Sequence, residues 1–249
     1  MAIPPVNLVV YSDELTPRNV LRQDNKQKSI VFYVTISEFP PDVASQAMFW
    51  LPLDVFRSHT AKSIPGRFSH IARRLLRSLF LSEQVHRGFV MKIADQHLRL
   101  FVNLEVTLFD GDAYRAIWQA KGASGKLPCL VCLNVVTDDE LVAEDDFFVS
   151  VSEHDHRKFL PATSADVFRK ADRLAEAVRD WEQGRGRKNV WEKLSKASRV
   201  SYHPDGLLYD AELRVFLDPC EQIMFDGMHV LFSNGLCVSL KRAWPFSTL

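Results

Sequence analysis

A succession of apolar, strand-like runs interrupted by one amphipathic helix limits the folds open to this chain more than any other feature. The runs at 6–12, 29–39 and 47–56 are rich in Val, Ile, Leu and aromatic residues, and Pro residues separate the second from the third. Such runs are typical of strands, and three in a row predict an antiparallel meander. Over 67–79 the apolar period becomes that of a helix, which we expect to lie on the sheet.

The next strand-like run, 98–109, leads directly into Asp110, and the first run ends near Asp13. The order of elements predicts an α/β fold with an RNase H-like mixed sheet: three antiparallel strands, then a helix, a strand and a helix. If the first and fourth strands are neighbours, the two carboxylates meet at one end of the sheet. Two divalent ions about 3.5–4 Å apart, bound by such carboxylates, can hold both reacting oxygens of a phosphodiester. The alternative is that both acids only cap turns.

The chain divides into three segments by composition. Residues 1–136 carry the predicted strands and both acids, and form the expected core. Residues 137–205 contain an acid-rich stretch, 138–146, and then a helical pattern broken near Gly184, which predicts an insertion of an acidic loop and helices. Residues 206–249 end the chain and include an Asp-x-x-His element.

The charges balance, with 31 basic and 31 acidic residues, so no overall field attracts the chain to nucleic acid or anionic lipid. The densest basic cluster follows the break at Gly184, where Arg185, Arg187 and Lys188 are our candidates for nucleic-acid contact. A solvated turn is the alternative. A second row of cations lies opposite the apolar face of the 67–79 helix and is expected to be solvated: Arg67, His70, Arg74 and Arg77.

Four cysteines in 249 residues do not form a disulfide-dense secreted scaffold. Two of them, Cys129 and Cys132, have the spacing of half a zinc site. The nearest further ligands in sequence are His154 and His156, which we favour over Cys220 and Cys237. The alternative is a reduced, partly buried pair of thiols without metal.

The first residues, MAIPPVNLVVYSDE, show neither the basic start nor the long apolar stretch of a secretion signal. No later apolar run approaches the roughly 20 residues that a membrane helix requires. We therefore expect a soluble, intracellular protein without a membrane partner.

Four blocks of sequence resemble, in their order and spacing, the CACTA (En/Spm-like) transposases and related transposon-derived reading frames. The blocks cover about half of the chain, and they read YSDELTPRNVL, LFDGDAYRAIWQAKGASGKLPCLVC, HPDGLLYD and FDGMHVLFSNG. The resemblance implies an RNase H-like core with a DDE acid triad that uses Mg²⁺ or Mn²⁺ to cut and join DNA. It also implies that the partner is DNA at transposon ends, that the protein is nuclear in a eukaryote, and that it can form an oligomer.

By position in these blocks, Asp13 resembles the first acid of the family and Asp110 the second. The Cys-x-x-Cys run that follows sets the register that selects Asp110 over Asp112. Asp226 and His229 resemble the Asp-x-x-His element that precedes the third acid.

Two departures from the family pattern shape the functional hypotheses. Asp13 stands in Ser-Asp-Glu rather than Asp-Gly, and the 20 residues after His229 contain no Glu or Asp to serve as the third acid. The first hypothesis is therefore a transposase-like domain that lacks one acid and has little activity of its own. The alternatives are a non-catalytic, zinc-stabilised nucleic-acid-binding or interaction module, and a complete nuclease with Asp226 as its third acid.

Overall fold

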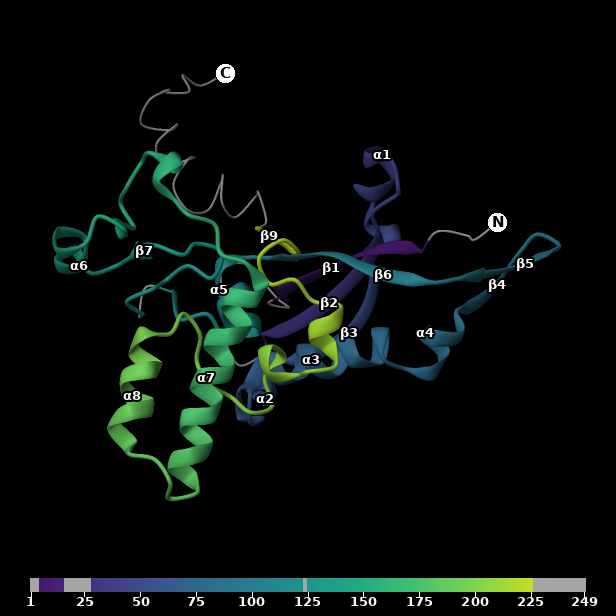
Figure 1. Cartoon of the computed structure of the whole chain (residues 1–249). Helices are drawn as coiled ribbons and strands as arrows, with labels where there is room; N and C mark the ends of the chain where they lie inside the picture. Colours follow the sequence, from purple (N-terminus) through teal and green to yellow (C-terminus); the bar gives the residue numbers. More distant parts are fainter. Residues whose placement is uncertain (1–4, 16–27, 123–124, 226–249) are drawn as a thin grey trace.

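The chain forms a mixed α/β structure, described by a computed structural model for residues 5–15, 28–122 and 125–225 (Figure 1). Its main sheet has five strands in the order β3-β2-β1-β6-β9, so β1 is central. These strands are β1 Val6–Leu15, β2 Ser29–Ile36, β3 Leu51–Arg57, β6 Val102–Phe109 and β9 Ile223–Phe225. Two small sheets pair β4 Phe89–Ile93 with β5 Gln96–Leu100, and β7 Val135–Val136 with β8 Val149–Ser150.

The helices differ widely in length, from one turn to five. The α-helices are α1 Pro41–Ala44, α2 Ser58–Ser63, α3 Arg67–Phe80, α4 Glu83–Arg87, α5 Gly111–Trp118, α6 Asp139–Glu144, α7 Ser164–Glu182 and α8 Lys188–Ala197. Short 3-10 helices are η2 Ala47–Phe49, η4 His156–Lys158, η5 Leu207–Tyr209 and η6 Leu213–Val215. Among the described helices, none is long and apolar enough to cross a membrane.

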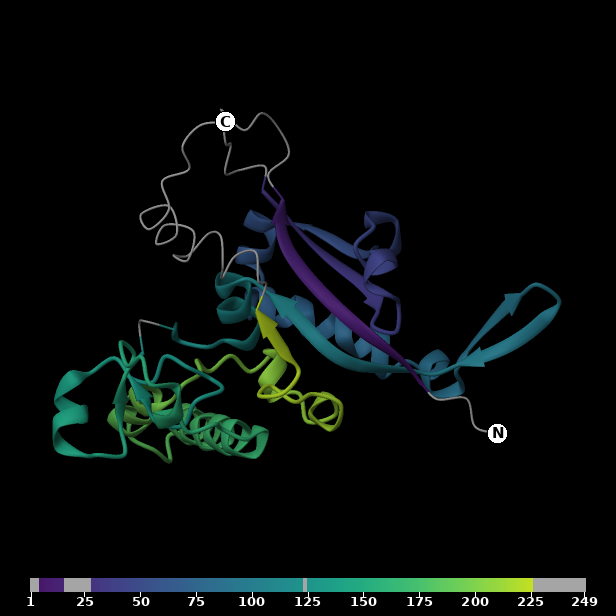
Figure 2. The same ribbon diagram turned by 90° about the horizontal axis from the view of Figure 1, so that it is seen from above.

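The first three strands form the predicted antiparallel meander, and the later strands of the main sheet pair in parallel. Strand β2 is antiparallel to both β1 and β3, whereas β1 with β6 and β6 with β9 are parallel pairs. The predicted fourth strand, 98–109, is divided in the structure: its first part belongs to β5 and its second part is β6. The break allows the β4–β5 hairpin to project from one end of the molecule in both views (Figure 1, Figure 2).

Helix α3 packs on one face of the main sheet, as its apolar period predicts. Val10 and Phe32 from the sheet join Leu76 from α3 and Trp118 from α5 in one buried cluster. Full burial of a side chain of this size stabilises the fold by roughly 1.5–3 kcal/mol. The same cluster includes buried residues of the two later segments, namely Val167, Ala171, Val200, Leu207, Leu208, Leu213 and Leu217, so all three segments share it.

A buried carboxylate ties the later part of the chain to α3. Asp210 is 4% exposed and accepts hydrogen bonds from Arg73 Nε at 2.6 Å and Arg77 Nη1 at 2.8 Å. Burial alone would raise the pKa of Asp210, but the two guanidinium groups outweigh it and hold the pKa below its usual value. Arg77 is thus engaged with Asp210, and the expectation of a uniformly solvated cation row on this helix was wrong there.

Replacing Asp210 with Ala should lower the free energy of unfolding by about 2–3 kcal/mol, measured by urea denaturation. This is less than the loss for a fully buried pair, because Arg73 and Arg77 keep 26% and 35% of their side-chain surface exposed and can be rehydrated. Glu212→Ala is the control, since Glu212 pairs with the same Arg77 but is 66% exposed. Equal effects of the two substitutions would contradict the assignment of Asp210 as the anchor.

Candidate functional site

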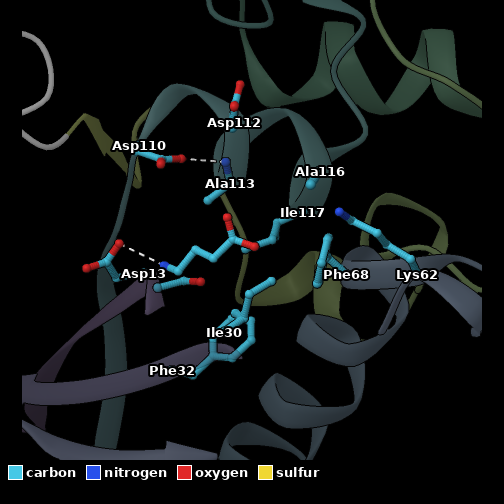
Figure 3. Close-up of a pocket in the computed structure, with 12 residues that line it drawn as sticks. Asp13, Ile30, Phe32, Lys62, Phe68, Asp110, Asp112, Ala113, Ala116 and Ile117 are labelled. Atoms are coloured by element: carbon cyan, nitrogen blue, oxygen red, sulfur yellow. Dashed lines mark hydrogen bonds between the residues drawn. The ribbon is translucent and has the colours of Figure 1, made fainter. Parts of the chain in front are cut away.

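The two predicted acids follow the last paired residues of two adjacent parallel strands. The register of β1 with β6 ends with Ser12 opposite Phe109. Asp13 comes next within β1, where it still pairs with Val31 of β2, and Asp110 is the first residue after β6. Both are half-buried, and both line one pocket of about 250 Å³ between the strand ends and α5. In Figure 3 the two acids lie on one side of this pocket and Lys62 lies on the other. The structure therefore brings Asp13 and Asp110 together at one edge of the sheet.

Each of these carboxylates already accepts a local hydrogen bond. Asp110 is the N-cap of α5, and its Oδ1 accepts from the Ala113 amide at 2.6 Å. Asp13 Oδ1 accepts from the amide of Glu14 at 2.7 Å. No described residue donates to the second oxygen of either carboxylate, Oδ2. Capping and ligand binding are thus compatible, because one oxygen of each group serves the backbone and the other faces no protein donor in this part of the chain.

Glu14 is a further acid that lines the same pocket, and the sequence did not single it out. Its carboxylate accepts from Ser58 Oγ at 2.8 Å and pairs with Lys28 Nζ at 2.9 Å. Burial raises its pKa, but the hydrogen bonds from Lys28 and Ser58 outweigh that effect and the net pKa is lowered. The sequence feature that could have indicated Glu14 is the strand period of two, which places it on the same face of β1 as the buried Val10 and Ser12.

The donor set of this pocket suits a hard cation. Mg²⁺ is commonly held by one or two protein carboxylates, with waters and substrate phosphate oxygens completing its six ligands. Asp13 and Asp110 match that requirement with one uncommitted oxygen each. Within residues 5–15, 28–122 and 125–225, no group of three or more Asp, Glu, His or Cys side chains is arranged to hold a metal ion.

Two further predicted site residues, Asp226 and His229, lie outside the described residues. The description of the chain ends with Phe225, the last residue of β9, which pairs with Phe109 of β6. Cys237, the least favoured zinc ligand, also lies outside.

The cysteine pair occupies a loop after α5, as predicted. The thiol of Cys132 lies close enough to that of Cys129 to be the main cause that lowers the pKa of Cys129, which is about 7. The same contact raises the pKa of Cys132, so the pair holds one proton tightly. Cys220, 88 residues beyond Cys132 in sequence, is close enough to influence Cys132 electrostatically.

The side chain of Arg199 adds a buried positive charge beside these thiols. Arg199 is 2% exposed, donates to the carbonyl of Leu133, and helps to lower the pKa of Cys129. Nε and Nη1 of this guanidinium have no hydrogen-bond partner among the described residues. His154, in contrast, is an exposed residue of an irregular loop, and His156 begins η4. Local spacing could not indicate Cys220 or Arg199, because both reach the pair only through the tertiary fold.

The predicted basic cluster lies at the exposed turn between α7 and α8. Arg185 forms an ion pair with Asp180 at 2.7 Å, and Lys188 lies 3.6 Å from Glu192. Arg187 is the exposed N-cap residue of α8. Two of the three cations therefore have acidic neighbours that weaken their field for an incoming phosphate.

No protein-family model matches this sequence, and no curated protein is significantly similar to it.

Cys129 should be alkylated by iodoacetamide at least about tenfold faster than Cys220 at pH 8. The thiolate is the reacting form, and burial raises the pKa of Cys220 to about 11 whereas that of Cys129 is about 7. Mass spectrometry of tryptic peptides over a pH series measures both rates in one sample.

Faster reaction of Cys220 would contradict this assignment of the thiolate. Added Zn²⁺ that protects Cys129 and Cys132 together, while exposed lysines still react with an amine reagent, would favour the predicted zinc clip over a metal-free thiol pair.

Proposed function

We propose that this chain is an RNase H-like domain of the DDE transposase type, with Asp13 and Asp110 as its metal-binding acids. The observation that carries the proposal is the parallel register of β1 and β6, which ends one residue before each acid. Further support comes from the strand order β3-β2-β1-β6-β9, with an antiparallel meander followed by parallel strands. Two of the four sequence blocks that resemble CACTA transposases contain these two acids.

The chemistry would be metal-assisted cleavage of a nucleic-acid phosphodiester. A bound Mg²⁺ or Mn²⁺ would polarise the phosphate and stabilise charge on the reacting oxygens. Asp13 and Asp110 would supply ligand oxygens, and the hydrogen bond from Ala113 would keep the Asp110 carboxylate from rotating. Lys62, across the pocket, would attract the polyanionic backbone.

Binding of Mn²⁺ tests the assignment directly. Titration followed by isothermal calorimetry should show one site that weakens at least about tenfold in Asp13→Asn and in Asp110→Asn, because each loses a charged ligand. Asn is as good an N-cap as Asp, so Asp110→Asn keeps the start of α5 intact.

Asp112→Asn is the matched control, since Asp112 lines the same pocket but is 84% exposed and pairs with Arg115. Loss of binding in the control alone would transfer the role from Asp110 to Asp112. Unchanged binding in all three variants would end the two-acid proposal.

A complete nuclease with Asp226 as third acid is the second candidate function. The observation that favours it is the pairing of Phe225 with Phe109, because Asp226 and Asp110 are the next residues in sequence after that pair. Two acids alone hold a second metal ion poorly, and the balanced charge of the chain opposes tight DNA binding.

With two acids only, we expect at most weak Mn²⁺-dependent nicking of supercoiled plasmid and no strand transfer. Robust nicking that both Asp110→Ala and Asp226→Asn abolish would establish the three-acid nuclease instead. Robust nicking that survives Asp110→Ala would contradict both candidates, because each of them requires Asp110.

A further inference from the structure

A second pocket adjoins the acid pocket and has the opposite charge. It measures about 230 Å³ and shares Lys62, Phe68 and Ala116 with its neighbour as a common wall. Four of its lining side chains are basic, and no carboxylate of the described residues lines it. The four are Lys62, Arg67, Arg115 and His203.

The positive charge of this pocket is only partly compensated within the described chain. Arg115 pairs with Asp112, and Lys62 acts on Glu14 from a distance. Arg67 faces His203, whose pKa is lowered first by burial and then by the charge of Arg67. The lowered pKa keeps the imidazole of His203 neutral near pH 7, so the positive charge of the pocket comes from Lys62, Arg67 and Arg115.

Gln119 lines the same pocket and carries a buried amide that is unpaired among the described residues. Gln119, the left-handed C-cap of α5, is 6% exposed, and neither Oε1 nor Nε2 has a hydrogen-bond partner among the described residues. Its amide lies against the backbone of Gly206, where any side chain would collide with it. A buried polar group without a partner costs about 1–3 kcal/mol. A ligand that accepts a hydrogen bond from Nε2 would recover part of that cost.

We propose that this pocket binds a phosphate group of a nucleic-acid backbone, held by Lys62, Arg67 and the Gln119 amide. Phosphate has the required charge, and its oxygens accept hydrogen bonds from ammonium, guanidinium and amide donors. The choice of nucleic acid as the source rests on the proposed function, because the shared wall sets this phosphate beside the acid pocket. A free phosphate or nucleotide offers the same chemistry, and the experiment separates these sources.

The experiment uses the full chain in EDTA, so that its outcome does not depend on the metal site. The probes are inorganic phosphate, followed by the NMR signal of the Gln119 side-chain amide, and a fluorescein-labelled single-stranded DNA oligonucleotide, followed by anisotropy. The variant is Lys62→Gln with Arg67→Gln. Arg74→Gln is the control, because it removes one positive charge from an exposed position of α3 that does not line the pocket.

The double substitution should weaken DNA binding at least about tenfold and reduce the salt dependence of log K by about one, whereas Arg74→Gln should do neither. Inorganic phosphate should shift the Gln119 amide signal in the parent chain and not in the double variant. A response to phosphate with no binding of DNA would keep the pocket but assign it to a free phosphate. DNA binding that is equal in the variant and the control, with no response of Gln119 to phosphate, would overturn the proposal.

Discussion

The parallel pairing of β1 with β6 is the constraint on which the rest of the molecule depends. Parallel neighbours cannot be joined by a tight turn, so the chain between them must cross over the sheet. Here the connection contains β2, β3 and α3, and the apolar side of α3 packs on one face of the sheet. The register of the pair then decides which side chains meet at the strand ends. Two acids nearly 100 residues apart thereby become neighbours.

Local periodicity accounts for the parts of the fold that could be predicted. The alternation in β1, β2 and β3 and the helical period of α3 were readable because each repeats over several residues. The helices on either side of Gly184 were also expected, and they are α7 and α8. Strand β9 has only three residues, too few for a period to appear, and it exists because β6 offers it a free edge. The short helix α6, in the stretch read as an acidic loop, was missed for the same reason.

The candidate site was predictable in position and not in detail. The apolar runs placed Asp110 correctly at the end of β6, and they placed Asp13 where the pairing of β1 with β6 ends, although β1 itself continues to Leu15. The capping of α5 by Asp110, the entry of Glu14 into the pocket and the approach of Cys220 to the cysteine pair depend on tertiary contacts. The unpaired amide of Gln119 depends on them as well, because Gly206 meets it from a segment 87 residues away.

The hydrogen bond from Ala113 to Asp110 couples whatever occurs at the sheet edge to the integrity of a helix. A helix of eight residues has few internal hydrogen bonds, and its first turn depends on its cap. An occupant that pulls the carboxylate away would let that turn fray, while one that binds only the second oxygen would leave it closed. Amide hydrogen exchange at the start of α5 would then distinguish the two cases. Exchange would be slower when the carboxylate keeps its capping hydrogen bond and faster when the occupant displaces it. The opposite end of α5 is anchored by the fully buried Trp118, so such opening would stay confined to the turn nearest the acids.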